Sequence, residues 1–198
     1  MAAQDYADVA TLRLMLKLED DDPRLSLVQR ALTSASRSID KTCGRRFWLD
    51  PTPVTRTYRL GGRTVCEDDG EVLLVDDVGS TDGLVVETGS GASWSPVTGY
   101  ETTPDNALLD ERPVTGLVRL GGSWGGGTSR VRVTARYGWP AVPHDIEQAA
   151  LIQAARLFRR KDSPEGVTGS AEWGVVRLSR RDPDVWNLIE QYVLDGFG

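Results

Sequence analysis

Residues 129–160 read SRVRVTARYGWPAVPHDIEQAALIQAARLFRR, and the change of pattern inside this stretch decides the fold. From Val131 to Tyr137, apolar residues alternate with arginine or threonine, which is the two-residue period of a half-buried strand. Two prolines follow, and from Ile146 to Phe158 the apolar residues recur at helical spacing. The sequence therefore predicts a β-rich region that gives way to a helix after residue 140.

Two helices are predicted before the β-rich region. Residues 5–18 form a short helix, and a longer one begins with Asp22 as its N-cap and Pro23 at its first helical position. Gly44 is expected to follow the end of the longer helix as its C′ residue. A strand is predicted at 175–178, and a last helix is predicted from Asp182. The longer of the two N-terminal helices is predicted to have one apolar face, which consists of Leu25, Val28, Leu32, Ala35, Ile39 and Cys43.

Short β-rich runs, separated by Asp, Gly and Pro, lie between the helical ends, at residues 55–60, 71–75, 84–87, 117–120 and 129–137. Residues 89–93 and 102–106 are predicted as loops, and Cys66 is predicted to lie in a turn. We therefore expect an α+β fold, in which N- and C-terminal helices form a helical bundle with an inserted small antiparallel β-domain. The expected domains are the N-terminal helices at 1–50, the β-rich region at 51–140, and the C-terminal helices with a Gly-rich segment at 141–198.

Charge is distributed unevenly along the chain of 198 residues, whose formal net charge is −6. Residues 64–111 contain twelve acids and no Lys or Arg. An uninterrupted field of that sign repels nucleic-acid phosphates, which argues against a helix-turn-helix regulator. The chain has no apolar run near the roughly 20 residues that a membrane span requires, and its N-terminus lacks the pattern of a secretory signal.

The residues that would carry catalysis or metal binding are sparse. The chain has two cysteines, Cys43 and Cys66, and one histidine, His144, which is expected on the surface at the start of a helix. Residues 121–127 lack the lysine of a phosphate-binding loop, and residues 76–83 lack the ligand spacing of a calcium loop. We therefore expect no catalytic residue, no metal and no cofactor.

Two readings of the β-rich region stay open at this point. The many acids of residues 64–111 leave a carboxylate pair for glycoside hydrolysis as an alternative, although their clustering in turn-like stretches favours a solvated acidic face. Trp124 lies among glycines and is expected to be an exposed contact anchor, whereas Trp139 and Trp186 are expected in the core. A small carbohydrate-binding or hydrolytic β-module is the alternative function.

The helical ends, read together, resemble the head-to-tail connector (adaptor) proteins of tailed bacteriophages. The resemblance covers about half of the chain and rests on YADVATLR at 6–13, ASRSIDKTCGRRF at 35–47, YGWPAVPHDIEQAALIQAARLFRR at 137–160, DSPEGV at 162–167 and VVRLSRRDPDV at 175–185. It implies a non-enzymatic virion protein that forms a ring of twelve copies below the portal and extends the DNA channel. Such a protein belongs to the virion neck and assembles in the host cytoplasm. Head-closure and tail-terminator proteins are alternatives within the same class.

The resemblance also implies partners and candidate site residues. The partners are the portal protein, a head-closure or tail-side neck protein, further copies of the chain, and double-stranded DNA that passes without specific binding; no membrane is involved. Contacts with portal or neck are expected from the C-terminal third, at Trp173, Arg177, Arg180, Arg181 and Trp186. An acidic channel wall, which would not trap DNA, is expected at Glu67, Asp68, Asp69, Glu71, Asp76 and Asp77.

Overall fold

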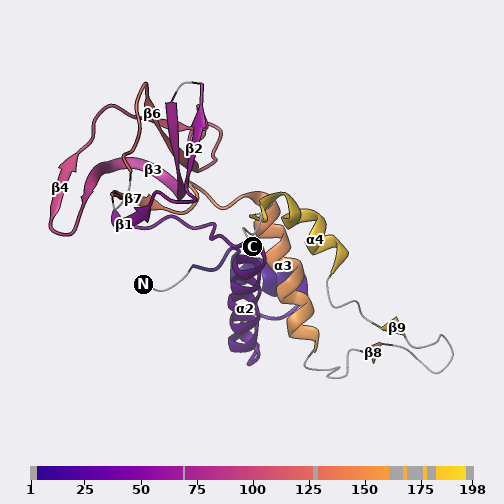
Figure 1. Cartoon of the computed structure of the whole chain (residues 1–198). Helices are drawn as coiled ribbons and strands as arrows, with labels where there is room; N and C mark the ends of the chain where they lie inside the picture. Colours follow the sequence, from indigo (N-terminus) through magenta and orange to yellow (C-terminus); the bar gives the residue numbers. More distant parts are fainter. Residues whose placement is uncertain are drawn as a thin grey trace. The chain divides into compact units, whose positions relative to one another are not determined.

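The computed structural model describes residues 4–68, 70–126, 129–160, 167–168, 176–177 and 182–194. The chain forms two compact units, and the ends of the chain share one of them (Figure 1). The first unit consists of Met1–Arg46 and Val142–Gly198, and the second of Phe47–Ala141. The described helices include none with the length and apolar character of a membrane span.

Helices build the first unit. They are α1 (Val9–Leu16), α2 (Leu25–Cys43), α3 (His144–Arg159) and α4 (Pro183–Ile189), followed by a short 3₁₀ helix at Glu190–Tyr192. Helix α2 packs on α3, and α3 packs on α4. Alanines on α3 allow close approach, because a small side chain leaves the helix backbones near each other. The buried face of α2 includes Val28, Leu32, Ala35 and Ile39, and that of α3 includes Ile146, Ala149, Ala150, Ala154 and Phe158. Two short strands, β8 (Val167–Thr168) and β9 (Val176–Arg177), pair with each other.

The helix ends follow the sequence signals in two places and depart from them in a third. The Asp182 carboxylate accepts hydrogen bonds from the backbone N–H of Asp184 (3.0 Å) and Val185 (3.4 Å), as expected for an N-cap. Gly44 adopts the expected left-handed conformation at the end of α2, with φ +67°. Helix α2 begins at Leu25 rather than Pro23. The Asp22 carboxylate accepts hydrogen bonds from the backbone N–H and the guanidinium of Arg24 instead of capping a helix that starts at Pro23.

An antiparallel sheet builds the second unit. Its strands are β1 (Val54–Arg59), β2 (Thr64–Glu67), β3 (Gly70–Ser90), β4 (Ser93–Pro96), β5 (Glu101–Thr103), β6 (Val114–Leu120) and β7 (Arg130–Tyr137). The order along the sheet is β1-β7-β3-β6-β5, so that β1 and β5 are its terminal strands. Strands β2 and β4 also pair with β3.

The long strand β3 joins two parts of the sheet. Its first part pairs with β2 and β6, and its last part pairs with β7 and β4. The register shifts between Leu74 and Val78 and again between Val78 and Val85, and the ribbon bends in this region (Figure 1). A core of apolar side chains lies against the sheet and includes Tyr58, Leu73, Val75, Val78, Val86, Leu117, Val131, Val133 and Tyr137.

The structure is α+β, but the sheet is larger than expected. The description as a helical bundle with a small inserted β-domain therefore needs correction: seven strands form one sheet, and the described chain is rich in sheet. Strand β2 includes Cys66, which was expected in a turn, and strands β4 and β5 include residues that were expected in loops. These strands are short, polar and paired on one side, so their sequences lack the apolar alternation that identifies a half-buried strand.

Candidate functional site

The acids of residues 64–111 fall into two groups. Acids of the first group have partners within the second unit. Glu71 accepts a hydrogen bond from the Trp124 backbone N–H, and Asp77 accepts one from the Trp139 indole. Asp76 pairs with Arg56 and Arg63, and Glu87 pairs with Arg132. The exposed group comprises Glu67, Asp68, Asp82, Glu101, Asp105, Asp110 and Glu111. Of the six acids expected at a channel wall, Glu67 and Asp68 are therefore exposed at the end of the β2–β3 hairpin, and Asp69 lies outside the described residues.

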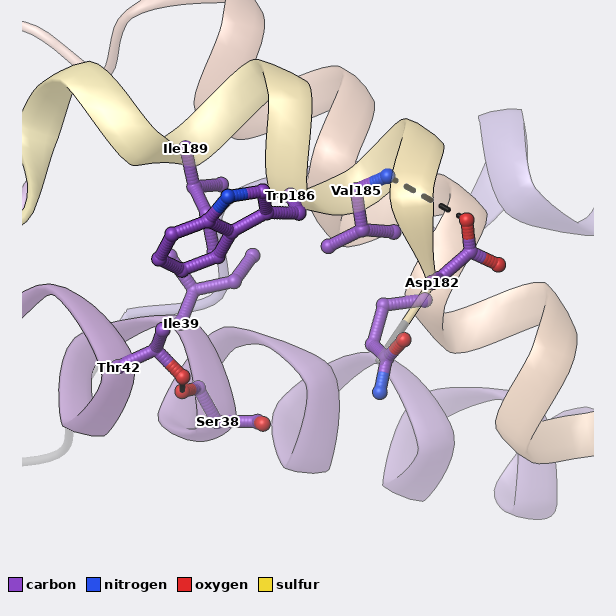
Figure 2. A pocket seen from close by; sticks show the side chains of 8 residues that line it. Ser38, Ile39, Thr42, Asp182, Val185, Trp186 and Ile189 are labelled. Carbon is purple, nitrogen blue, oxygen red and sulfur yellow. Dashed lines mark hydrogen bonds between the residues drawn. The ribbon is translucent and has the colours of Figure 1, made fainter. Parts of the chain in front are cut away.

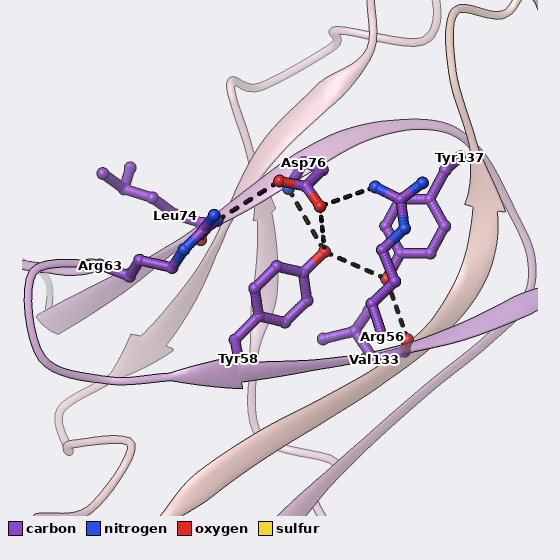
Figure 3. Close-up of polar contacts among 7 residues, drawn as sticks. All are labelled: Arg56, Tyr58, Arg63, Leu74, Asp76, Val133 and Tyr137. Atoms are coloured by element: carbon purple, nitrogen blue, oxygen red, sulfur yellow. Dashed lines mark hydrogen bonds and ion pairs between the residues drawn. The ribbon is translucent and has the colours of Figure 1, made fainter. Parts of the chain in front are cut away.

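A polar cluster surrounds Asp76 at the bend of β3 (Figure 3). The guanidinium of Arg56 donates to the Asp76 carboxylate at 2.6 Å, and that of Arg63 donates to it at 3.4 Å. The Tyr58 hydroxyl lies 3.2 Å from the same carboxylate and 3.3 Å from the Tyr137 hydroxyl. The Tyr137 hydroxyl donates to the Val133 carbonyl at 2.9 Å. These contacts connect β1, β3 and β7 through side chains.

The two tyrosines of this cluster lie in an environment that disfavours ionisation of their hydroxyls. Both are buried, with 4% of Tyr58 and 1% of Tyr137 exposed. Burial raises the pKa of each hydroxyl, and the neighbouring Tyr58 hydroxyl adds to the increase in the pKa of Tyr137. A phenol that resists ionisation is a poor base or nucleophile, so the arrangement suits packing rather than catalysis.

A hollow next to the polar cluster is lined by residues of β1, of the turn that follows it and of β3. We call it the β1 hollow; it is lined by Arg56, Thr57, Tyr58, Arg59, Gly61, Arg63 and Asp76. Three guanidinium groups and one carboxylate give this lining a formal charge of +2. Its chemistry therefore suits an anionic group, because arginine offers several donors in a planar fork.

A smaller groove of about 150 Å³ lies between α2 and α4 in the first unit (Figure 2). The half-buried indole of Trp186 and the buried side chain of Ile39 both line it. Its other lining residues are Ser38, Thr42, Gln153, Asp182, Val185 and Ile189. Trp186 was expected both in the core and at a partner contact; it lies in the wall of this groove and is half-buried. The other residues expected at a partner contact lie outside the described residues: Trp173, Arg180, Arg181 and the side chain of Arg177.

The prediction for Trp124 was wrong. Only 2% of this residue is exposed, and its indole N–H donates to the Glu71 carbonyl at 2.9 Å. Its ring lies 6.3 Å from that of Tyr100. The flanking glycines give the chain enough freedom to turn the indole into the core, and a glycine-rich context alone does not reveal that outcome.

The remaining chemical candidates take ordinary structural places. The side chain of His144 is fully exposed, 3.5 Å from the Glu147 carboxylate one helical turn away. Residues 76–83 belong to β3 instead of forming a calcium loop. Within the described residues, no group of three His, Cys, Asp or Glu side chains is placed to hold a metal ion.

Comparisons with known proteins identify the fold. No model of a protein family matches the chain, and no curated protein matches it. Among solved structures, it is similar to a chain from the neck of an empty gene transfer agent particle computed with C6 symmetry. That match has a TM-score of 0.55 and 19% identity, and it covers 100% of this chain and 98% of that one.

A second similar chain comes from the virion of a native gene transfer agent particle, with a TM-score of 0.50 and 19% identity. This match covers 100% of the present chain and 95% of the other. What the three chains share is their fold. Because both matches extend over nearly the whole of each chain, the likeness includes the helical unit and the sheet together.

Proposed function

We propose that this protein is a structural component of the neck of a tailed phage or a phage-like particle. The observation that carries the proposal is the fold shared with a neck chain over 100% of this chain and 98% of that one. The described chemistry agrees with a role without catalysis. Glu71, Asp76 and Asp77 each contact a donor from the chain itself, an arrangement that suits packing more than glycoside hydrolysis.

Within the neck, we assign the protein to the head-to-tail adaptor. The resemblance of its helical ends to connector proteins supports this position below the portal, where it would extend the DNA channel and dock a head-closure or tail-side protein. A ring of twelve copies is compatible with sixfold symmetry, as in the neck computed with C6 symmetry, because each repeating sector would contain two copies.

Two surfaces are proposed for these contacts. The groove at Trp186, together with Trp173, Arg177, Arg180 and Arg181, would bind the portal or the next neck protein, since tryptophan and arginine dominate interface hot spots. The hairpin acids Glu67, Asp68 and Asp69 would face the channel. Carboxylates there would repel DNA phosphates and let the duplex pass without being held.

Co-expression with the portal protein of the same genome tests this function. Tagged portal should retain the untagged chain, and electron microscopy should show it as a ring on one end of the portal. Trp186→Ala should weaken retention at least tenfold, whereas Trp94→Ala, a change of another half-buried tryptophan in the sheet unit, should not. Portal that retains none of the chain, together with particles that join capsids to tails without it, would contradict the proposal.

A further inference from the structure

The sheet unit carries two surfaces of opposite charge, each next to a terminal strand of the sheet. The β1 hollow lies along β1, and the loop at residues 104–113 connects β5 to β6. Because the order of the sheet is β1-β7-β3-β6-β5, the two surfaces belong to opposite ends of that order. Two different complementary surfaces on one chain are what a head-to-tail contact between copies requires.

The first surface is the β1 hollow. Its lining carries a formal charge of +2, and Thr57, Arg59 and Arg63 in this lining are exposed. The aliphatic parts of the exposed Arg59 and Arg63 side chains add apolar surface beneath their charged groups. In the described part of the chain β1 pairs with β7 alone, so no strand pairs with its other edge. The hollow therefore offers donors for carboxylates together with an apolar surface.

The second surface, which we call the acidic knob, is formed by residues 104–111. Its backbone is held by hydrogen bonds from Leu109 N–H to the Asn106 carbonyl (2.9 Å) and from Glu111 N–H to the Leu108 carbonyl (3.3 Å). Ala107 is buried and Leu108 packs against the core, which anchors the loop. Leu109 is 82% exposed as a result. The apolar side chain is thus presented on a loop that is already ordered, which lowers the entropy cost of binding.

Acids surround the exposed leucine. Asp105, Asp110 and Glu111 are all exposed, and they give the acidic knob a formal charge of −3; Arg112 follows the knob directly. This charge is opposite in sign to that of the β1 hollow. The knob combines an apolar centre with a charged rim, which is the usual anatomy of a protein interface.

We propose that the acidic knob of one copy binds the β1 hollow of the next copy, so that the copies join head to tail. Leu109 lies against the aliphatic stems of the exposed arginines, and the knob acids pair with Arg59 and Arg63. This inference rests on the proposed function, because it supplies the contact between copies that a neck ring needs. A duplex DNA phosphate is the competing occupant of the hollow, but it would leave the matching apolar centre of the knob unexplained.

Disulfide trapping in the complex with portal tests this contact. The chain carries Thr57→Cys and Leu109→Cys in a Cys66→Ser background, which removes the exposed native thiol. Oxidation should give a ladder of linked copies up to the complete ring. A mixture of chains that each carry only one of the two new cysteines should give linked dimers and nothing longer. Thr57→Cys with Asp82→Cys, whose second site is exposed outside the knob, should give no ladder.

Charge exchange provides an independent readout in the same complex. Arg59→Glu with Arg63→Glu, or Asp110→Arg with Glu111→Arg, should reduce the number of copies retained on portal by at least tenfold. Combining all four changes should restore retention, because the charges are exchanged across the contact. Asp82→Arg with Glu101→Arg is the matched control and should leave retention unchanged.

The outcomes separate the two proposals. If portal retains the chain but no ladder forms and the charge variants still assemble, the head-to-tail contact is wrong while the neck function stands. If the arginine changes abolish binding to a duplex DNA oligonucleotide and leave the ring intact, DNA is the occupant of the hollow and the inference is overturned. If portal does not retain the unmodified chain and particles join capsids to tails without it, the proposed function itself fails, and the contact with it.

Discussion

Arg56 and Asp76 connect the first strand of the sheet to the bend of its longest strand: the Arg56 guanidinium donates to the Asp76 carboxylate at 2.6 Å and lies 3.9 Å above the ring of Tyr137. The pair occurs where the register of β3 shifts, between Leu74 and Val78. Side-chain contacts there take the place of regular backbone pairing. The ion pair therefore stabilises the bend of β3 and also attaches β1 to it.

Removing the Asp76 charge should weaken the sheet unit moderately. Asp76→Asn leaves Arg56 and Arg63 without their carboxylate, and we expect a loss of about 1 kcal/mol in the free energy of unfolding, because both side chains of the main pair are partly exposed and solvent screens them. Denaturant titration measures the loss. Asp82→Asn, a change of an exposed acid in the same strand, should alter stability by less than about 0.5 kcal/mol. Equal effects of the two changes would contradict a structural role for the pair.

The tyrosines should make the protein less stable in alkali. Burial raises the pKa of Tyr58, Tyr100 and Tyr137, and these hydroxyls keep their protons in the folded state at pH values where the unfolded chain loses them. The free energy of unfolding should therefore fall as the pH rises above the ordinary tyrosine pKa of 10.0. Near-ultraviolet phenolate absorbance should show fewer ionised tyrosines in the folded protein than the five of the unfolded chain. Simultaneous ionisation of all five in the folded state would contradict this.

Gly138 should tolerate no side chain. Its φ is +112°, and a Cβ atom added there would lie 1.9 Å from the Trp48 carbonyl oxygen. Gly138→Ala should therefore cost about 3 kcal/mol or more of unfolding free energy. Gly61→Ala is the matched control, because a Cβ atom at that turn meets nothing within 4 Å, and its effect should stay within about 0.5 kcal/mol. Thermal melts of the two variants measure the difference, and an unchanged melt for Gly138→Ala would contradict the described backbone.

The two cysteines should differ sharply in reactivity. Cys43 is fully buried, and burial raises the pKa of its thiol to about 11, so that at pH 8 only roughly one thiol in a thousand is ionised. Cys66 is exposed. A thiol reagent should modify one cysteine rapidly in the folded protein and the second only after unfolding. Cys66→Ser should remove the rapid phase, and rapid modification of two thiols in the unmodified chain would disagree with the buried position.

The sequence predicted the elements whose own apolar residues repeat at the spacing of a helix or a strand. The apolar spacing of α2 and α3, the alternation in β7 and the start of the last helix at Asp182 are local signals, and the structure confirms each of them. The continuity of β3 through residues 76–83 was not predictable in the same way. Its polar residues there were expected in a turn, but Arg56 and Trp139 bind two of its acids from strands and loops far away in the sequence.

The candidate site depends even more on distant contacts. The β1 hollow brings together Arg63 and Asp76 with residues of β1, and no spacing within one segment indicates that arrangement. The long acidic run suggested one continuous surface, whereas pairing within the sheet unit removes Glu71, Asp76, Asp77 and Glu87 from it. Trp124 shows the same limit, since its burial depends on Glu71 and Tyr100.

The discontinuous first unit has a consequence for synthesis on the ribosome. Helix α2 ends at Cys43, and its packing partner α3 begins at His144. About a hundred further residues must therefore be synthesised before the apolar face of α2 can pack on α3. At roughly 5–20 residues per second, that delay lasts about 5–20 s. Residues 47–141 emerge as one uninterrupted piece during this interval. We therefore expect the sheet to fold first in the nascent chain, while α2 remains a target for chaperones until the last third of the polypeptide has been made.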